Sequence, residues 1–384
     1  MRKKQILKSI VGLLLSLAML GPAAAYAIDN VPDDPELKGL LKPEEMQAIL
    51  DDYIEDKHLN PDNISIGYCY TPTGETWYYN ENEWYYSASM YKVPLMMLFA
   101  EKEAAGELTQ ESMLKGITLA TAEEYILVNS NNEWAHLMMA VLGTEPDCRR
   151  MEQKYSDLPM DAYDPDFYDY SYFSAKFMTD VMMTLYYNQE RFPHIIDCLK
   201  RAQTDSYFHK RLGEDYPIAQ KYGSYTDYSN RLFNHTSGII FSDNPFILTV
   251  MTLNMGVSDA IIGDLAQAYE EYTHTLDTRL EERKAELAEA ERKAEEARLQ
   301  AEAAAQQPEE TPAALEEKTP DIQNGEPGRV DAAAMEGTEE AEQPQRSGAT
   351  RLLVIGTSAL VLVLLLIVSL SRSRKHRRVG AGRR

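Results

Sequence analysis

The sequence is poor in cysteine and has no overall excess of positive charge. Its 384 residues include three cysteines, Cys69, Cys148 and Cys198, an odd number that lie far apart. This count and spacing exclude a disulfide scaffold and a zinc motif, so we expect no metal. With 38 Lys and Arg against 61 Asp and Glu, the formal net charge is −23. Such a chain repels phosphate backbones, which argues against a nucleic-acid partner.

Both ends of the chain lack acidic residues. All 61 acidic residues lie between residues 28 and 350. Residues 1–27 have a basic start, an apolar run up to Leu20 and the ending Ala25-Tyr26-Ala27. These are the three parts of a secretory signal peptide, and we expect cleavage after Ala27. An uncleaved N-terminal anchor is the alternative, although the apolar run is short for a membrane span.

A second apolar stretch, residues 351–371, lies near the C-terminus. From Leu352 to Ser371 no residue is charged, and a helix of this length would span about 30 Å. Residues 372–384 then carry seven basic residues and no acidic one, and positive charge stays on the cytoplasmic side. We therefore expect a single-pass protein of the cell membrane with its middle part outside and its tail cytoplasmic. A cell-wall sorting signal has a similar ending, but the LPxTG motif that it requires is missing.

Two polar segments precede this stretch. Residues 306–350 contain five prolines and many Glu and Ala, which indicates a disordered linker. Residues 259–305 contain no proline, and an apolar face recurs at three- and four-residue steps up to Leu280. Charged pairs such as Glu289 and Lys293 follow, which predicts an exposed helical stalk over residues 281–305. A coiled-coil seam is the alternative, with apolar positions that are mostly alanine, and the oligomeric state stays open.

Residues 28–280 have the composition of one folded domain. Alternating apolar residues around a turn at Pro72-Thr73-Gly74 predict strands at Ile64–Tyr70 and Glu75–Tyr79. Residues 89–215 are mostly helical in pattern, and three short strands follow at 218–221, 236–241 and 246–251. Strands at both ends with helices between them predict an α+β fold. One antiparallel sheet would be flanked by helices, with an all-helical subdomain inserted.

The first chemically suggestive motif is Ser89-Met90-Tyr91-Lys92, at the start of an apolar helix. A serine and a lysine three residues apart share one helical face, so the amine can reach the hydroxyl. Serine is a weak nucleophile unless a base removes its proton, and a lysine that is shielded from water can act as that base. The motif is short, and a helix cap followed by a solvated lysine is the alternative interpretation.

Two more motifs follow. Ser130-Asn131-Asn132 precedes a second helical run, where an N-cap is the alternative interpretation. Lys221-Tyr222-Gly223 lies on a predicted strand, and the glycine would let a substrate backbone approach closely. A lysine on an edge strand is the alternative there.

The order and context of the three motifs resemble those of the penicillin-recognising serine enzymes, namely class A β-lactamases and D-Ala-D-Ala peptidases. The resemblance covers roughly residues 40–275 and implies no cofactor. It implies that Ser89 is the nucleophile, Lys92 the base and Ser130 the proton shuttle. It also implies that Lys221 assists electrostatically and that Asn132, Tyr222, Gly223 and Ser224 bind substrate. The N–H groups of Ser89 and Ser224 would form the oxyanion hole.

Several features depart from the family pattern. The family's omega loop carries a Glu that directs the deacylating water, whereas the corresponding stretch here has aspartates and no Glu. These aspartates are Asp157, Asp161, Asp164, Asp166 and Asp169. Leu158 is nearest in position to the missing Glu, so the sequence does not choose among them. Tyr222 replaces the usual Thr or Ser, Ser237 stands where many members have Arg, and the interval from Ser89 to Ser130 is short.

The same loop is rich in tyrosine, with Tyr163, Tyr168, Tyr170 and Tyr172 close together. Aromatic faces suit the binding of sugars, so these rings could line a glycan groove. Packing of a loop that lacks aliphatic residues is the alternative interpretation.

Three hypotheses for function follow. The first is a membrane-anchored extracytoplasmic serine hydrolase that cleaves β-lactams, with slow deacylation because the omega-loop Glu is not found. The second is a D-Ala-D-Ala carboxypeptidase that acts on peptidoglycan peptides. The third is a non-catalytic surface protein that binds wall fragments or β-lactams as a sensor.

Overall fold

The computed structural model describes residues 28–305 except residue 257. The predicted signal peptide (1–27), linker (306–350), membrane helix (351–371) and basic tail (372–384) lie outside the described residues and stay predictions. Among the helices of the described residues, none is long and apolar enough to cross a bilayer.

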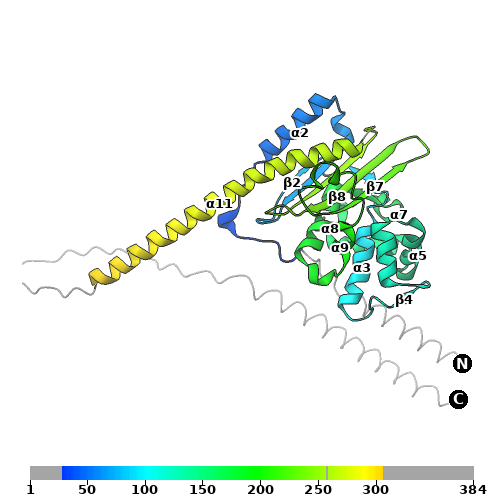
Figure 1. Ribbon diagram of the computed structural model, residues 1–384, viewed down its shortest axis with the longest axis horizontal. Helices are drawn as coiled ribbons and strands as arrows, with labels where there is room; N and C mark the ends of the chain where they lie inside the picture. The colour runs from blue at the N-terminus through cyan, green and yellow to red at the C-terminus, as the bar shows by residue number, and fades with distance from the viewer. Residues whose placement is uncertain (1–27, 257, 306–384) are drawn as a thin grey trace, which may run out of the picture. The chain divides into compact units, whose positions relative to one another are not determined.

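A five-stranded antiparallel sheet forms the centre of the fold (Figure 1). Its strands are β1 Ile64–Tyr70, β2 Glu75–Tyr79, β7 Ile218–Thr226, β8 Leu232–Ile240 and β9 Phe246–Leu253. The order is β2-β1-β9-β8-β7, so strands from the two ends of the domain meet at the β1–β9 pair. The structure therefore confirms the predicted α+β fold with one antiparallel sheet.

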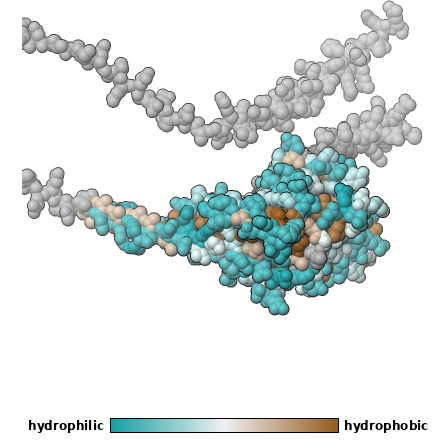
Figure 2. Space-filling model, turned by 90° about the horizontal axis from the view of Figure 1, so that it is seen from above, coloured by the Kyte–Doolittle hydropathy of each residue, from teal (hydrophilic) through white to brown (hydrophobic). Residues whose placement is uncertain are grey.

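Helices from the two ends of the domain cover one face of this sheet. They are α2 Pro43–Lys57 and the long α11 Ser258–Ala305, and the short α10 His209–Leu212, which precedes β7, packs beside α11. Met46 and Leu50 of α2 and Leu265 and Tyr269 of α11 join the strands in one buried apolar cluster. Side chains of α11 are buried as far as Leu280, and those of residues 281–303 are half-buried or exposed. In Figure 2 this last part of α11 is hydrophilic or weakly apolar, as an exposed helix requires.

The other face of the sheet supports the helical region. This region comprises α3 Lys92–Ala104, α4 Leu119–Glu123, α5 Asn132–Leu142, α6 Glu145–Glu152, α7 Pro165–Tyr170, α8 Ala175–Tyr187 and α9 Ile195–Lys200. A π-helical turn, Glu124–Val128, joins α4 to α5. Helix α8 packs directly on β1, because Gly67 leaves room for the Thr179 side chain: a Cβ on Gly67 would lie 2.1 Å from Thr179 Oγ1.

Two short strand pairs were not predicted. One joins β3 Trp84–Tyr86 to β6 Tyr172–Ser174, and the other joins β4 Met113–Leu114 to β5 Ile117–Thr118. The β3–β6 pair brings the segment that leads to Ser89 beside the end of the aspartate-rich loop. The three cysteines are buried and free, so Cys148 and Cys198 do not form a disulfide.

Candidate active site

Ser89 lies in a tight turn between β3 and α3. Met90 N donates to Ser87 O at 3.0 Å, and Lys92 N donates to Ser89 O at 3.4 Å. Ala88, directly before the serine, has a φ of 49°. This left-handed conformation is unfavourable for a residue other than glycine and persists only where its surroundings enforce it. The turn thus holds the Ser89 hydroxyl in a fixed position at the start of α3.

Lys92 is fully buried beneath Ser89. Its Nζ atom lies 2.9 Å from Ser89 Oγ, 2.6 Å from Ser130 O and 2.6 Å from Asn132 Oδ1. Burial removes water from the ammonium group and lowers the pKa of Lys92 to about 8. No carboxylate forms a salt bridge with this lysine in the part of the chain that the structure describes. A neutral amine at this distance can accept the proton of the Ser89 hydroxyl.

The segment Ser130–Asn132 shows which residue caps helix α5. Asn131 is the N-cap, because its Oδ1 accepts a hydrogen bond from Trp134 N at 3.0 Å. The capping interpretation of the motif therefore applies to its middle residue. Ser130, with a φ of 53°, and Asn132 lie on either side of the cap, and both contact Lys92.

Lys221 reaches the same group of side chains from strand β7. It is fully buried, and its Nζ atom lies 3.0 Å from Ser130 Oγ and 3.0 Å from Tyr222 O. Burial, together with the positive charge of Lys92, lowers the pKa of Lys221 well below its usual range. Ser130 Oγ therefore has one lysine on each side, an arrangement that can relay a proton.

Gly223 lets β7 approach the Ser89 turn closely. A Cβ atom there would lie 2.5 Å from Ser87 O and 2.9 Å from Ser89 N. Ser224, the next residue, lines the same small cavity as Ser89. The Tyr222 ring instead stacks on Tyr207, with 5.3 Å between ring centroids. Tyr222 does not line this cavity, and its ring also lies 4.3 Å from Lys221 Nζ.

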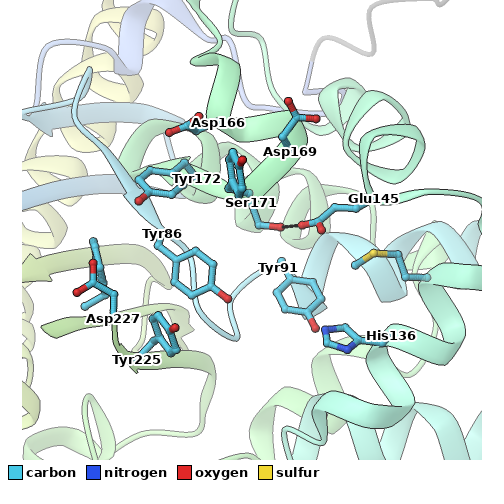
Figure 3. Close-up of a pocket in the computed structure, with 13 residues that line it drawn as sticks. Tyr86, Tyr91, His136, Glu145, Asp166, Asp169, Ser171, Tyr172, Tyr225 and Asp227 are labelled. Atoms are coloured by element: carbon cyan, nitrogen blue, oxygen red, sulfur yellow. Dashed lines mark hydrogen bonds between the residues drawn. The ribbon is translucent and has the colours of Figure 1, made fainter. Parts of the chain in front are cut away.

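Two adjoining cavities open at the site. The smaller, about 150 Å³, is lined by Tyr86, Ala88, Ser89, Tyr91, Asn132, His136, Ser224 and Tyr225. The larger, about 460 Å³, shares Tyr86, Tyr91, His136 and Tyr225 with it and extends towards α7 (Figure 3). The sequence analysis did not identify these four shared residues. His136 follows Asn132 by four residues, so the helical period could have placed both on one face of α5.

The aspartate-rich loop supplies no carboxylate to the smaller cavity among the described residues. Asp157 pairs with Lys176 at 2.6 Å and lines a separate cavity beside Tyr78. Leu158 packs against the apolar core. Asp166 and Asp169 line the larger cavity. The structure therefore places neither Asp157 nor Asp161 beside Ser89.

The tyrosines of this loop divide between the two expected roles. Tyr163 is buried and packs on Phe167, with 4.7 Å between ring centroids. Tyr170 and Tyr172 line the larger cavity. The cluster thus serves partly as a loop core and partly as the wall of a cavity.

A buried ion pair anchors this loop to the nucleophile turn. Arg149 and Glu152 of α6 are fully buried and contact each other, and Arg149 Nε lies 3.1 Å from Ser171 Oγ. The guanidinium also lies over the rings of Tyr91 and Phe173, at 5.2 and 5.3 Å. The Arg149 side chain thus joins α6, the end of the loop and Tyr91, which directly precedes Lys92. Burial raises the pKa of Glu152 to about 7, against the opposing effect of Arg149.

His235 fixes the backbone that leads to Ser89. Its Nδ1 accepts from Thr252 N at 3.0 Å, so the proton is on Nε2, which donates to Tyr86 O at 3.1 Å. Burial lowers the pKa of His235 from 6.5 to about 4. The unfolded chain therefore takes up this proton more readily than the folded one.

Because of His235, we expect the free energy of unfolding to decrease by up to about 3 kcal/mol as the pH falls from about 6.5 to about 4. The buried carboxyls Glu123, Glu152 and Asp180 have raised pKa values and act in the opposite direction. Denaturant unfolding of wild type and His235→Asn across this pH range isolates the effect. The stability difference between the two proteins should narrow as the pH falls, and a constant difference would contradict the prediction.

No group of three or more His, Cys, Asp or Glu in the described residues could hold a metal ion. The arrangement instead provides one hydroxyl nucleophile, two buried amines and a second hydroxyl within hydrogen-bonding distance of one another. This set supplies a nucleophile, a base and a proton relay, the groups that formation of an ester at Ser89 requires.

Comparisons with known proteins identify the family. A model of the β-lactamase enzyme family matches residues 44–273. No curated protein matches the chain.

Solved structures give the same fold. The TLA-3 extended-spectrum β-lactamase is 14% identical, with a TM-score of 0.51 over 60% of this chain and 99% of its own. A variant of the TLA-1 extended-spectrum β-lactamase is 13% identical, with a TM-score of 0.51 over 60% of this chain and 98% of its own. A β-lactamase from Chitinophaga pinensis is 13% identical, with a TM-score of 0.49 over 59% of this chain and 99% of its own. At these identities the likeness of the first two establishes the fold.

Proposed function

The chain belongs to the β-lactamase enzyme family, and from this premise we propose that it is a serine acyl-enzyme hydrolase that cleaves β-lactams through Ser89. The observation that carries the proposal is the distance of 2.9 Å between Lys92 Nζ and Ser89 Oγ. The lysine is buried, and its pKa is lowered to about 8. About a tenth of Lys92 is therefore neutral at pH 7, far more than of an exposed lysine, and this form can accept the hydroxyl proton.

Acylation would proceed in two linked transfers. Ser89 Oγ bonds to the carbonyl carbon of the β-lactam while Lys92 accepts its proton, and the N–H groups of Ser89 and Ser224 stabilise the oxyanion. The carbon–nitrogen bond then breaks, Ser130 donates a proton to the departing nitrogen, and Lys92 passes to Ser130 the proton that it took from Ser89. Ser130 is suited to this role because its hydroxyl lies 3.2 Å from Lys92 and 3.0 Å from Lys221.

Deacylation is the step that the site supports least. Among the described residues, no carboxylate lines the cavity that contains Ser89. A water molecule there lacks the base that class A enzymes use, so we expect the acyl-enzyme to accumulate. The same observation favours a second candidate, a D-Ala-D-Ala carboxypeptidase with another route of deacylation. Release of D-Ala from a pentapeptide, measured beside nitrocefin hydrolysis, separates the two activities.

Incubation with benzylpenicillin is expected to give a covalent adduct on Ser89. Because ring opening releases no fragment, the protein should gain the full mass of the antibiotic in intact-protein mass spectrometry. Peptide mapping should place the adduct on the peptide that contains Ser89, and the Ser89→Ala protein should remain unmodified. Folded wild-type protein that stays unmodified would refute acylation.

The rate of acylation should rise with pH and level off above the pKa of Lys92. Only the neutral amine can accept the serine proton, and burial places this pKa at about 8. We therefore expect an increase of about tenfold per pH unit well below 8 and a plateau above about 9. Stopped-flow acylation by nitrocefin measures the profile. A rate that falls as the pH rises through 8 would show that the charged lysine is the active form.

We also propose that the domain acts outside the cytoplasmic membrane and is held there by residues 351–371. Support comes from the sequence, which combines a signal peptide pattern with an uncharged stretch and a basic tail. Protease treatment of intact cells should remove the domain if this orientation holds.

A further inference from the structure

The larger cavity continues the cavity of the proposed nucleophile. The two share Tyr86, Tyr91, His136 and Tyr225, and the larger one has a volume of about 460 Å³. On α5 it begins one turn beyond Asn132, the residue proposed to bind the substrate amide. A side chain on the acyl part of a substrate can therefore extend into it.

Aromatic rings form much of the wall. Tyr86 lies 4.9 Å from Tyr225 and 6.1 Å from Tyr172 between ring centroids, and Tyr170 completes the group. Rings grouped in this way present electron-rich faces that attract cations.

Four carboxylates line the cavity, and two of them, Glu145 and Asp227, lie near an arginine. Glu145 contacts Ser171 and lies 3.9 Å from Arg149, and Asp227 pairs with Arg231 at 2.7 Å.

Asp166 and Asp169 of α7 have no such compensation. Both are exposed, line the cavity, and form no salt bridge with another described residue. Asp169 lies one residue before the end of α7, where the carbonyl groups of the helix already make the potential negative. Asp166 lies in the first turn of α7, where the free N–H groups favour its charge. A cation in the cavity would offset the charge of both carboxylates.

One buried polar atom beside the cavity lacks a partner among the described residues. Tyr91 is 7% exposed, and its hydroxyl has no hydrogen-bond partner among the described residues. In Figure 3 this hydroxyl is directed towards His136 at the junction of the two cavities. A buried hydroxyl without a partner is unfavourable, and a ligand N–H could satisfy it.

We propose that this cavity binds an ammonium group on the acyl part of the substrate. The preferred substrate would be a peptide or β-lactam whose acyl portion carries a basic amine, such as the side chain of a diamino acid. The tyrosine rings would contact the cation, and Asp166 and Asp169 would supply the opposite charge. This inference rests on the proposed function, because it assumes that the acyl group is attached at Ser89.

The test compares two peptides that differ only in charge. These are Nα-acetyl-L-Lys-D-Ala-D-Ala with a free side-chain amine and the same peptide with that amine acetylated. Binding is measured by NMR titration on the Ser89→Ala protein, so the result does not depend on acylation. We expect the free amine to bind about tenfold more tightly, with the preference decreasing as ionic strength rises.

Variants of α7 test whether the preference for the free amine depends on Asp166 and Asp169. In Asp166→Asn and Asp169→Asn, made on the Ser89→Ala background, the preference for the free amine should fall to about threefold or less. Asp161→Asn is the matched control, because Asp161 is exposed in the same loop but does not line the cavity, and it should keep the full preference. Thermal melts establish that each variant is folded.

Equal binding of the two peptides, or tighter binding of the acetylated one, would overturn the proposal. A preference that survives in both α7 variants would also overturn it, because the cation would then bind elsewhere. Failure of the proposed function has a different signature, namely no adduct of wild-type protein with benzylpenicillin, which carries no amine on its acyl group.

Discussion

Replacement of Lys92 by methionine is expected to slow acylation of Ser89 by benzylpenicillin about a thousandfold. The methionine side chain has a similar length but cannot accept a proton, and general-base catalysis of this kind contributes about 10²–10⁴-fold. Stopped-flow or quenched-flow measurement of adduct formation gives the rate constant. The loss should persist at every pH, because no other described group within hydrogen-bonding distance of Ser89 Oγ can act as the base.

The arginine variant separates catalysis from structure. Lys92 also donates to Ser130 O and Asn132 Oδ1, both at 2.6 Å, so the methionine variant leaves these acceptors without their donor. Lys92→Arg keeps the charge and the donors, but its pKa is too high for it to serve as a base. We expect it to be as slow as Lys92→Met. Restoration of the rate to within about tenfold of wild type would show that Lys92 only positions its neighbours.

The sequence predicted those parts of the fold that depend on local pattern. Strands β1 and β2 begin and end where the alternation of apolar residues and the turn between them predict. The β3–β6 pair was missed because each strand has three residues, too few for a periodic signal. Their partners also lie far apart in sequence, with Trp84 opposite Ser174.

The site, too, was predictable only where short local motifs identify its residues. Ser89, Lys92, Ser130, Asn132 and Lys221 could be named from short motifs, and the structure brings all five together. The sequence could not say whether Ser130-Asn131-Asn132 caps a helix or lines a site. One hydrogen bond decides this, because Asn131 takes the capping position and the residues beside it remain free for Lys92.

The choice among the loop aspartates was beyond the sequence because it depends on distant partners. Lys176 on α8 holds Asp157, and Arg149 on α6 holds Ser171 at the end of the loop. Asp166 and Asp169 lie on α7, between these two held positions, and border the larger cavity. A carboxylate-rich loop therefore lies beside the site without supplying a base to Ser89.

Replacement of Gly223 by alanine is expected to reduce acylation by about 10²–10³-fold. The φ of this glycine is not in the left-handed region, so the reason for glycine is space. The added Cβ would lie 2.5 Å from Ser87 O and 2.9 Å from Ser89 N, and both are backbone atoms that cannot rotate away. Strand β7 and the Ser89 turn would have to separate, which would open the proposed oxyanion hole between the N–H groups of Ser89 and Ser224.

A second glycine provides the control for stability. Gly67→Ala also introduces a close contact, with Thr179 Oγ1 at 2.1 Å, but between β1 and α8. We expect each variant to lose about 1–3 kcal/mol in denaturant unfolding. Only Gly223→Ala should lose acylation under conditions where both are folded, because only that contact moves the two halves of the oxyanion hole apart. Equal acylation by the two variants would mean that the approach of β7 to Ser89 serves packing alone.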